Sequence, residues 1–342
     1  PLFEYYQYKG QSETHPSLSP NDEFANFEVW DTANLNGVMK APGMIAREYA
    51  RQALANGLRI EAALGANPFK FGAAAGTDTH TGIAAADENN FWGKLASGEP
   101  SANRWNQDFA KQKDGKFRKE WTMSAAGYTG VWATANTREA IWDAMKRKET
   151  YASSGPRITV RFFGGCDFAA ADARADTLAA TGYAKGVPMG GDLKPAPAGK
   201  VPTFLIAAMK DPDGANLDRA QIVKGWVDAA GKTHEAIYDV VWSDAAKRTP
   251  VGGKLPPVGD TVDLATATYT NSIGATELVG SFKDPSFDPK VRAFYYLRVL
   301  EIPTPRWPAY DAAKYKVKLT PDVTTKLQER AATSPIWYTP AG

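Results

Sequence analysis

The sequence lacks the residues and motifs that mark several large classes of protein. It has a single cysteine, Cys166, so no disulfide can form within the chain. No apolar run approaches the roughly 20 residues that a membrane-crossing helix needs. The net charge is only +2 and there is no long basic block, so the electrostatic signature of a nucleic-acid-binding protein is absent. We expect neither a membrane span nor a nucleic-acid partner.

Motifs of several common enzyme classes are also missing. There is no Gly-x-x-x-x-Gly-Lys-Ser/Thr or Gly-x-Gly-x-x-Gly loop and no Gly-x-Ser-x-Gly turn, which argues against nucleotide cofactors and against a serine hydrolase. The chain has only 3 histidines, and it has no His-x-His, His-Glu-x-x-His or paired-cysteine motif. A centre of two or three metal ions needs roughly six or more ligands, which these residues barely supply.

The most informative segment that is present is Thr-Asp-Thr-His at residues 77–80, set among glycines and alanines. In an extended segment Asp78 and His80 project from the same side, where both can bind one divalent metal ion. The alternative is a turn in which Asp78 caps the following residues and His80 lies on the surface. No neighbouring aliphatic run explains His80 as a core residue.

Further candidate site residues lie near the first predicted strand and in the middle of the chain. Glu13 and His15 are two residues apart and share one side of an extended segment, so they are candidate metal ligands; the alternative is a surface turn before Pro16. Lys9 is a candidate for holding an anionic oxygen of a substrate. Arg157 follows a Ser-Ser-Gly-Pro run, where it would clamp a phosphoryl group or form a structural ion pair.

Hydrophobic periodicity predicts an α/β region over residues 1–156. A strand opens the chain, and spacing of three and four residues predicts a helix from Met44 to Leu64, with Pro42 in its first turn. A second helix is predicted from a cap at Asn136. Its apolar stripe is Ile141, Trp142 and Met145. The polar stretch 101–120 is predicted to be an exposed loop.

After Pro156 the apolar residues recur at every second position, which is the spacing typical of β-strands. Alternating or strand-like runs occur at 158–162, 204–208, 238–242 and 294–299, separated by turns rich in proline and glycine. We therefore predict an all-β domain, with a β-sandwich-like architecture, over residues 157–342. The 211–214 segment, Asp-Pro-Asp-Gly, is predicted to be an ordinary β-turn, since it lacks the spacing of a calcium loop.

Seven blocks follow one another in a familiar order: residues 8–13, 67–72, 76–80, 136–141, 149–155, 292–298 and 334–338. Together they resemble the C-terminal part of a bacterial domain-of-unknown-function family within the polymerase-and-histidinol-phosphatase (PHP) superfamily. The resemblance implies the C-terminal part of a distorted (β/α)7 barrel, followed here by the β-domain. It also implies a cluster of zinc, manganese or iron ions.

Within this resemblance, Asp78 and His80 match the last metal-binding motif of the superfamily. The block that contains Glu13 is part of the family pattern, which favours a site role for Glu13 as ligand or catalytic base; His15 follows it. The N-terminal His-x-His, the bridging glutamate and the middle histidines of the family have no counterpart. We therefore expect a missing N-terminal segment of the same protein that supplies them, and we expect the chain to depend on it for activity.

The resulting functional hypothesis is a metal-dependent hydrolase of phosphoric or phosphonic esters that uses metal-activated water. Asp78, His80, Glu13 and His15 would serve the metal, and Lys9 and Arg157 would orient a small anionic ester. Two alternatives stay open: a hydrolase of carbamate or amide bonds, and an inactive binding or scaffolding module. The sequence does not choose between periplasm and cytoplasm, and it leaves the oligomeric state open.

Overall fold

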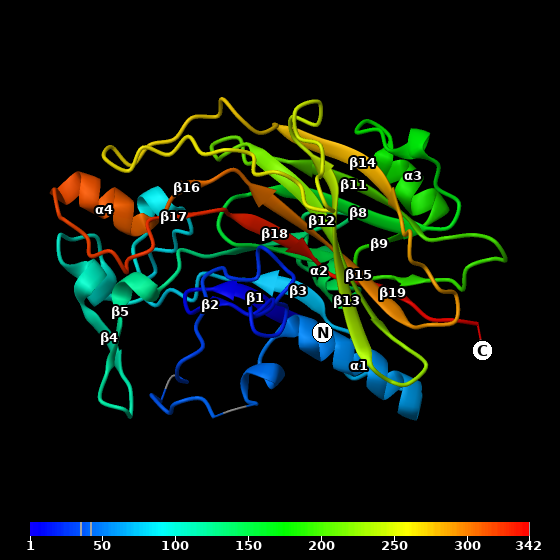
Figure 1. Ribbon diagram of the computed structural model, residues 1–342, viewed down its shortest axis with the longest axis horizontal. Coiled ribbons are helices and arrows are strands. Elements are labelled where there is room, and N and C mark those ends of the chain that lie inside the picture. The colour runs from blue at the N-terminus through cyan, green and yellow to red at the C-terminus, as the bar shows by residue number, and fades with distance from the viewer. Residues whose placement is uncertain (35, 42, 342) are drawn as a thin grey trace.

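The computed structural model describes residues 1–34, 36–41 and 43–341. These residues form a mixed α/β fold that is dominated by sheets, with few helices (Figure 1). The sheets are stacked in layers, and most of the buried apolar side chains lie between the layers. No helix in the described part of the chain is long and apolar enough to cross a membrane.

The central layer is an open sheet of eight strands. Its strand order is β10-β19-β15-β18-β7-β6, and β12 pairs with β15 and with β13. All pairs are antiparallel except β10 with β19. The strands are β6 (Tyr128–Val131), β7 (Thr150–Ser153), β10 (Asp192–Leu193), β12 (Leu217–Val227), β13 (Thr233–Trp242), β15 (Ala293–Glu301), β18 (Arg330–Thr333) and β19 (Ile336–Tyr338).

A second, antiparallel sheet packs on one face of the central sheet. It has the order β14-β11-β8-β9 and consists of β8 (Thr159–Gly165), β9 (Val187–Pro188), β11 (Thr203–Met209) and β14 (Glu277–Lys283). Phe162 and Phe204 stack from this sheet, and Phe204 also contacts Tyr295 of β15. The alternating pattern of the sequence therefore locates β8 and β11 correctly, and it identifies the face that each of them buries, whereas it does not predict β9 and β14.

The opposite face of the central sheet is covered by α1 (Ala50–Leu64) and by a small sheet, β2-β1-β3. The small sheet consists of β1 (Leu2–Gln7), β2 (Gly10–Gln11) and β3 (Gly72–Ala75). Strands β1 and β3 are parallel and are connected through α1, which is the arrangement expected of a β-α-β unit. None of the described sheets closes into a barrel.

The first helix begins later than its periodicity predicts. Ile45–Arg47 form a separate 3-10 helix, and Tyr49 is extended (φ −116°, ψ 142°), so α1 starts at Ala50. Its first amides, those of Ala50 and Arg51, donate to the carbonyl groups of residues 12 and 13. This tertiary contact satisfies helix-terminal donors and fixes the start of the helix. Pro42 lies outside the described residues. The predicted end at Leu64 is confirmed.

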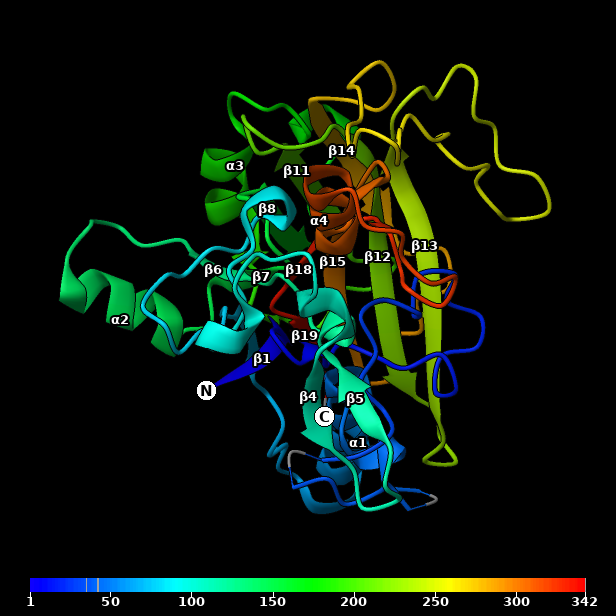
Figure 2. The ribbon, with the colours of Figure 1, turned by 90° about the vertical axis from the view of Figure 1, so that its left-hand side faces the viewer.

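The second predicted helix, α2 (Arg138–Lys146), differs in its cap and in its buried face. Thr137, not Asn136, is the N-cap, and its hydroxyl accepts from the Ala140 amide. Trp142 is 61% exposed, whereas Ala144 is fully buried. Figure 2 shows why: α2 lies at one side of the molecule, so only its inner edge meets the sheet.

Two further predictions about local structure are wrong. The region after residue 156 is not all-β, because it contains α3 (Leu178–Lys185) and α4 (Trp307–Tyr315), which packs beside β16 (Thr304–Pro305) and β17 (Lys326–Leu327). The stretch 101–120 is not simply a loop, since it holds the hairpin β4 (Asp108–Lys111) and β5 (Phe117–Lys119). Arg104 in this stretch is buried and forms an ion pair with Asp311 of α4.

The predicted domain boundary at 156/157 falls between β7 and β8. Strands β6 and β7, which precede it, join the central sheet through the pairing of β7 with β18. Ser154 continues this contact, because its amide donates to the Arg330 carbonyl at 2.9 Å. The two predicted segments therefore share one sheet.

Candidate functional site

The fold brings Lys9 and Asp78 together from segments that are far apart in the sequence. Lys9 lies in the turn after β1, and Asp78 follows β3. Because β1 and β3 are parallel neighbours, the segments that leave their carboxyl ends meet at the same edge. The ammonium groups of Lys9 and Lys94 both donate to Asp78 Oδ2. Asp78 itself has a left-handed backbone (φ 54°), which turns the chain at this point.

His80 lies beside this cluster. Its Nδ1 is 2.8 Å from the carbonyl oxygen of Asp78 and 3.8 Å from Asp78 Oδ1. The His80 amide donates to the Lys94 carbonyl at 2.8 Å, which ties the segment after β3 to residues 93–94. The His80 side chain is 53% exposed. The position thus has features of both interpretations: a surface turn, and an imidazole adjacent to the predicted carboxylate.

The electrostatics of the cluster follow from its two lysines. Partial burial raises the pKa of Asp78, but the hydrogen bonds from Lys9 and Lys94 outweigh burial and lower it overall. Glu4, on β1, is close enough to interact with Asp78. Burial, and then the charge of Asp78, raise the pKa of Glu4. Asp78 is therefore the fixed anion of this cluster, held by two cations.

These residues are of the right kinds for a divalent metal, but they are too few. Asp78 offers a carboxylate and His80 an imidazole, while a catalytic zinc site takes three protein ligands. Within the described residues, no group of three or more His, Cys, Asp or Glu side chains is arranged to hold a metal ion. One of the two oxygens of Asp78, Oδ2, already accepts from two ammonium groups. We therefore derive no reaction step through a metal from these contacts.

Lys9 also borders a hollow of about 410 Å³. Trp30, Lys40 and Tyr49 also line this hollow, and Lys40 is paired with Glu48. Lys9 thus stands between the Asp78 carboxylate and an open volume that is large enough for a small ligand. This placement is compatible with the predicted role of Lys9 in orienting an anionic group.

Glu13 lies in a different, buried environment. Its carboxylate accepts from Arg51 Nη2 at 2.9 Å, from Arg298 Nη1 at 3.1 Å and from the hydroxyl groups of Tyr6 and Tyr296. The residue is 2% exposed. Among the described residues, Glu13 shares no hydrogen bond or ion pair with Asp78 or His80. Burial raises the pKa of Glu13, but the two guanidinium groups lower it overall.

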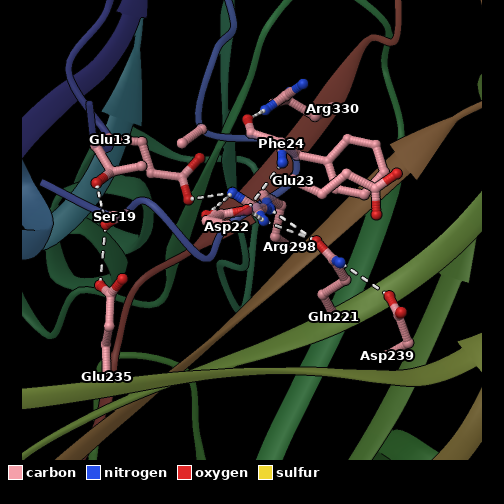
Figure 3. Close-up of polar contacts among 12 residues, drawn as sticks. Glu13, Ser19, Asp22, Glu23, Phe24, Gln221, Glu235, Asp239, Arg298 and Arg330 are labelled. Atoms are coloured by element: carbon pink, nitrogen blue, oxygen red, sulfur yellow. Dashed lines mark hydrogen bonds and ion pairs between the residues drawn. The ribbon is translucent and has the colours of Figure 1, made fainter. Parts of the chain in front are cut away.

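The surroundings of Glu13 form an ion network that connects the layers of the fold. Asp22 receives two hydrogen bonds from Arg298, at 2.9 and 2.6 Å, and Gln221 of β12 accepts from the same guanidinium. Figure 3 shows Glu13, Asp22 and Gln221 around Arg298. Arg51 brings α1 into the network through its ion pairs with Glu13 and Asp22. These contacts favour a structural role for Glu13.

His15 is also buried, with partners different from those of Glu13. Its Nδ1 is 2.7 Å from the Ser17 hydroxyl, its Nε2 is 3.2 Å from Asp31 Oδ2, and its ring packs on Tyr49. In the part of the chain that the structure describes, His15 shares no contact with Asp78 or His80. The predicted set of metal ligands is therefore divided among three places in the fold.

Arg157 lies at the wall of a cavity, as its position after Pro156 suggested, but this cavity is acidic. Its guanidinium is paired with Asp211 at 3.0 Å and with Asp213 at 2.6 Å. The predicted β-turn at 211–214 is confirmed by the Gly214 amide donating to the Asp211 carbonyl. Because two carboxylates already neutralise Arg157, its contacts are those of a structural ion pair.

Sequence reasoning missed Lys94 and the glutamates of the acidic cavity, Glu88, Glu301 and Glu329. Lys94 sits in an irregular segment without a motif. Glu301 is the last residue of β15 and follows several apolar residues. Such a pattern predicts that the charged residue is exposed at the end of the strand. Its burial depends on the turn 211–214 and on α4, which come from elsewhere in the sequence.

Searches of curated proteins and of solved structures found no match. A family model with the description "Protein of unknown function (DUF3604)" matches residues 1–340. This confirms the expected resemblance to a family of unknown function, and it covers almost the whole chain. The protein therefore belongs to the DUF3604 family.

Proposed function

We propose that the protein is a metal-dependent hydrolase of phosphoric or phosphonic esters, of the PHP superfamily, and that the Asp78 cluster belongs to its active site. One observation carries the proposal: Lys9, Asp78 and His80, all nominated from the sequence, are brought together at the ends of two parallel strands. The carboxyl edge of parallel strands is where α/β proteins place their ligands. On this proposal, β1, α1 and β3 are the C-terminal part of a distorted (β/α)7 barrel.

The described residues account for the anion-binding part of such a site. Lys9 and Lys94 present two ammonium groups that Asp78 holds in place. Each ammonium group is a point charge, so it attracts an anionic ester oxygen without requiring the two-point hydrogen bonding that arginine provides. Such fixed cations stabilise charge that develops on non-bridging oxygens. His80, with Nδ1 turned to a carbonyl oxygen, has Nε2 available on its exposed side.

The metal part of the proposal needs more ligands than Asp78 and His80. Zinc, manganese or iron would each require at least one further protein ligand here. Glu13 and His15 are engaged elsewhere, so we propose that another segment of the same protein, N-terminal to these residues, contributes the missing ligands. The need for further ligands follows from the small number of donors in the cluster, and their N-terminal position is what the resemblance to the PHP superfamily implies.

The test uses protein of the length that its source produces. We expect stoichiometric transition metal by elemental analysis, together with hydrolysis of a chromogenic phosphodiester. Asp78→Asn should lose most of the metal and the activity while it keeps the far-ultraviolet circular dichroism of the wild type, because one anionic ligand is removed. Asp114→Asn, at the exposed tip of the β4–β5 hairpin, is the matched control and should change neither.

Two outcomes would overturn the proposal. If folded Asp78→Asn keeps the wild-type metal content, Asp78 is not a ligand. If the wild-type protein is free of metal yet binds a polymer or a protein, a binding module is the better description. A metal-containing enzyme that cleaves a carbamate or an amide, but no ester, would keep the site and correct the substrate class.

A further inference from the structure

The acidic cavity beside Arg157 is separate from the Asp78 cluster. It has a volume of about 170 Å³ and lies between the turn 211–214, the end of β15 and α4. Three glutamates line it, and all are buried: Glu88 is 9% exposed, Glu301 1% and Glu329 4%. Carboxyl groups are seldom buried without a partner, so this concentration calls for an explanation.

Two of these glutamates have an oxygen atom without a partner. Glu301 Oε1 and Glu88 Oε1 are buried and accept no hydrogen bond from the described residues. The other oxygen of Glu88 accepts from the Trp307 amide, and Glu329 accepts from the Ser154 hydroxyl. A buried polar atom without a partner costs about 1–3 kcal/mol, and more when it is charged. The cavity therefore offers two acceptor oxygens to which no side chain of the described residues donates.

Neighbouring cations already have partners of their own. Arg157 is paired with Asp211 and a second aspartate, and Arg306 forms a two-point ion pair with Glu28. Lys210 donates to the Gly214 carbonyl at 2.7 Å. Side chains that could neutralise the cavity are thus directed to other groups. A ligand is left to supply the missing N–H donors and the positive charge.

Gly214 packs closely against Glu301 in the wall of the cavity. A Cβ atom at Gly214 would lie 2.9 Å from Asp211 Cβ and 3.3 Å from Glu301 Oε1, so glycine avoids crowding the Glu301 carboxyl group. The phenol rings of Tyr269 and Tyr310 complete the wall, and aromatic rings favour organic cations. The described carboxylates are not arranged to hold a metal ion.

We propose that this cavity binds a small organic cation through a protonated amino or guanidino group, which donates N–H hydrogen bonds to Glu301 Oε1 and Glu88 Oε1. The proposal is independent of the hydrolase function, since the two sites share no residue. It assigns a role to carboxyl groups that neither the Asp78 cluster nor the buried ion network uses.

Binding should release protons. Burial raises the pKa of Glu88 to about 8; Glu28 adds to this rise and Arg306 opposes it. Burial also raises the pKa of Glu301 and of Glu329. At neutral pH the Glu88 carboxyl group of the empty cavity therefore holds a proton. An arriving cation displaces carboxyl protons into the buffer, and the carboxylates that form accept its N–H groups.

The experiment is isothermal titration calorimetry of the wild-type protein with ethylammonium and with guanidinium. Titrations at one pH in two buffers of different ionisation enthalpy count the protons that are released. We expect saturable binding of at least one of the two cations, with proton release. Tetramethylammonium carries the charge but no N–H group, and it should bind at least tenfold more weakly, because each hydrogen bond to a charged group is worth about 1.5–3 kcal/mol.

Glu301→Gln keeps the size of the side chain and removes its charge, and it should weaken binding at least about tenfold. Glu120→Gln is the matched control, since Glu120 is buried but does not line the cavity, and it should bind as the wild type does. The proposal is overturned if the folded wild type binds neither cation, if tetramethylammonium binds equally well, or if only calcium or manganese binds. Both comparisons on the wild type remain decisive even if Glu301→Gln fails to fold.

Discussion

At the residue scale, the acidic side chains of this protein differ in whether a cation neutralises them. Asp78 has two lysines and Glu13 has two arginines, so both keep their charge, and both have a lowered pKa. Glu301 and Glu329 are buried among other carboxyl groups, and their pKa is raised. The same residue type therefore has a lowered pKa where guanidinium groups surround it and a raised pKa where it is buried among other carboxyl groups.

We expect Glu13→Gln to destabilise the protein by about 3–5 kcal/mol, because it leaves Arg51 and Arg298 short of an anion in a buried network. Urea unfolding followed by circular dichroism measures this change. Glu23→Gln is the control: its side chain is 56% exposed and 4.0 Å from Arg219, so it should cost less than about 1 kcal/mol. A Glu13→Gln protein as stable as the control would show that Glu13 is not a structural anchor.

Glu88 gives a prediction about pH. Burial raises its pKa from 4.5 to about 8; Arg306 lowers it, Glu28 raises it, and the Trp307 amide and Arg104 lower it by less. Between pH 4.5 and 8 the folded state holds a proton that the unfolded state has released. The stabilisation is complete below pH 4.5 and is lost as the pH rises toward 8.

The free energy of unfolding of the wild type should therefore decline over this range, and Glu88→Gln should make the decline shallower, because glutamine does not titrate. Urea unfolding at intervals between pH 5 and 8 tests this. Identical pH profiles for Glu88→Gln and the wild type would exclude Glu88 as the titrating group. Asp114→Asn, on the exposed hairpin, should leave the profile as it is.

At the scale of elements, what matters is which face of each helix or strand meets the central sheet. β8 and β11 contribute alternate residues to the core between the two sheets, as a period of two dictates. α1 buries one stripe against the opposite face. α2 buries one small residue, Ala144, against the fold, while Ile141 and Met145 are half-buried and Trp142 remains exposed.

This difference predicts opposite responses to removal of two large aromatic residues. Phe162→Ala, in the core between the sheets, should cost about 3–5 kcal/mol of stability. Trp142→Ala, on α2, should cost less than about 1 kcal/mol, because its side chain is largely exposed. Thermal and urea unfolding of both variants measure the contrast. Equal losses would mean that Trp142 is buried in solution by a contact absent from this chain alone.

At the scale of the whole molecule, the central sheet joins segments from both halves of the chain. β7 pairs with β18, α1 packs on β12, and Arg298 of β15 binds Glu13 and Asp22. Contacts between residues this far apart in sequence make the halves depend on each other. If one half of the chain is removed, a buried ion pair between the halves loses one of its two residues, and the other is left with an uncompensated charge.

We therefore expect the fragment 157–342 to be less stable than the whole chain, and to aggregate, because β18 loses its partner β7 and presents an open edge. The whole chain should unfold in one transition, seen at the same temperature by circular dichroism and by tryptophan fluorescence. A monomeric fragment 157–342 with the melting temperature of the whole chain would show that the 156/157 boundary separates independent domains.

The sequence alone determined the features that depend on local periodicity and on motif. It located β1, β8 and β11 of the second sheet, and β15, as well as the end of α1 and the turn at 211–214, since each depends on neighbouring residues. It also nominated Lys9, Asp78 and His80, which the fold brings together. These predictions succeed because side-chain alternation and turn-forming residues act over a few residues of chain.

Only the tertiary structure decided what depends on residues far apart. The start of α1 is set by the carbonyl groups of residues 12 and 13, and the exposure of Trp142 by where α2 meets the sheet. The separation of Glu13 and His15 from Asp78, and the burial of Glu301, arise from contacts between segments distant in sequence. Charge and burial are properties of an assembled environment, so the partner of a carboxylate is fixed only when the sheets pack.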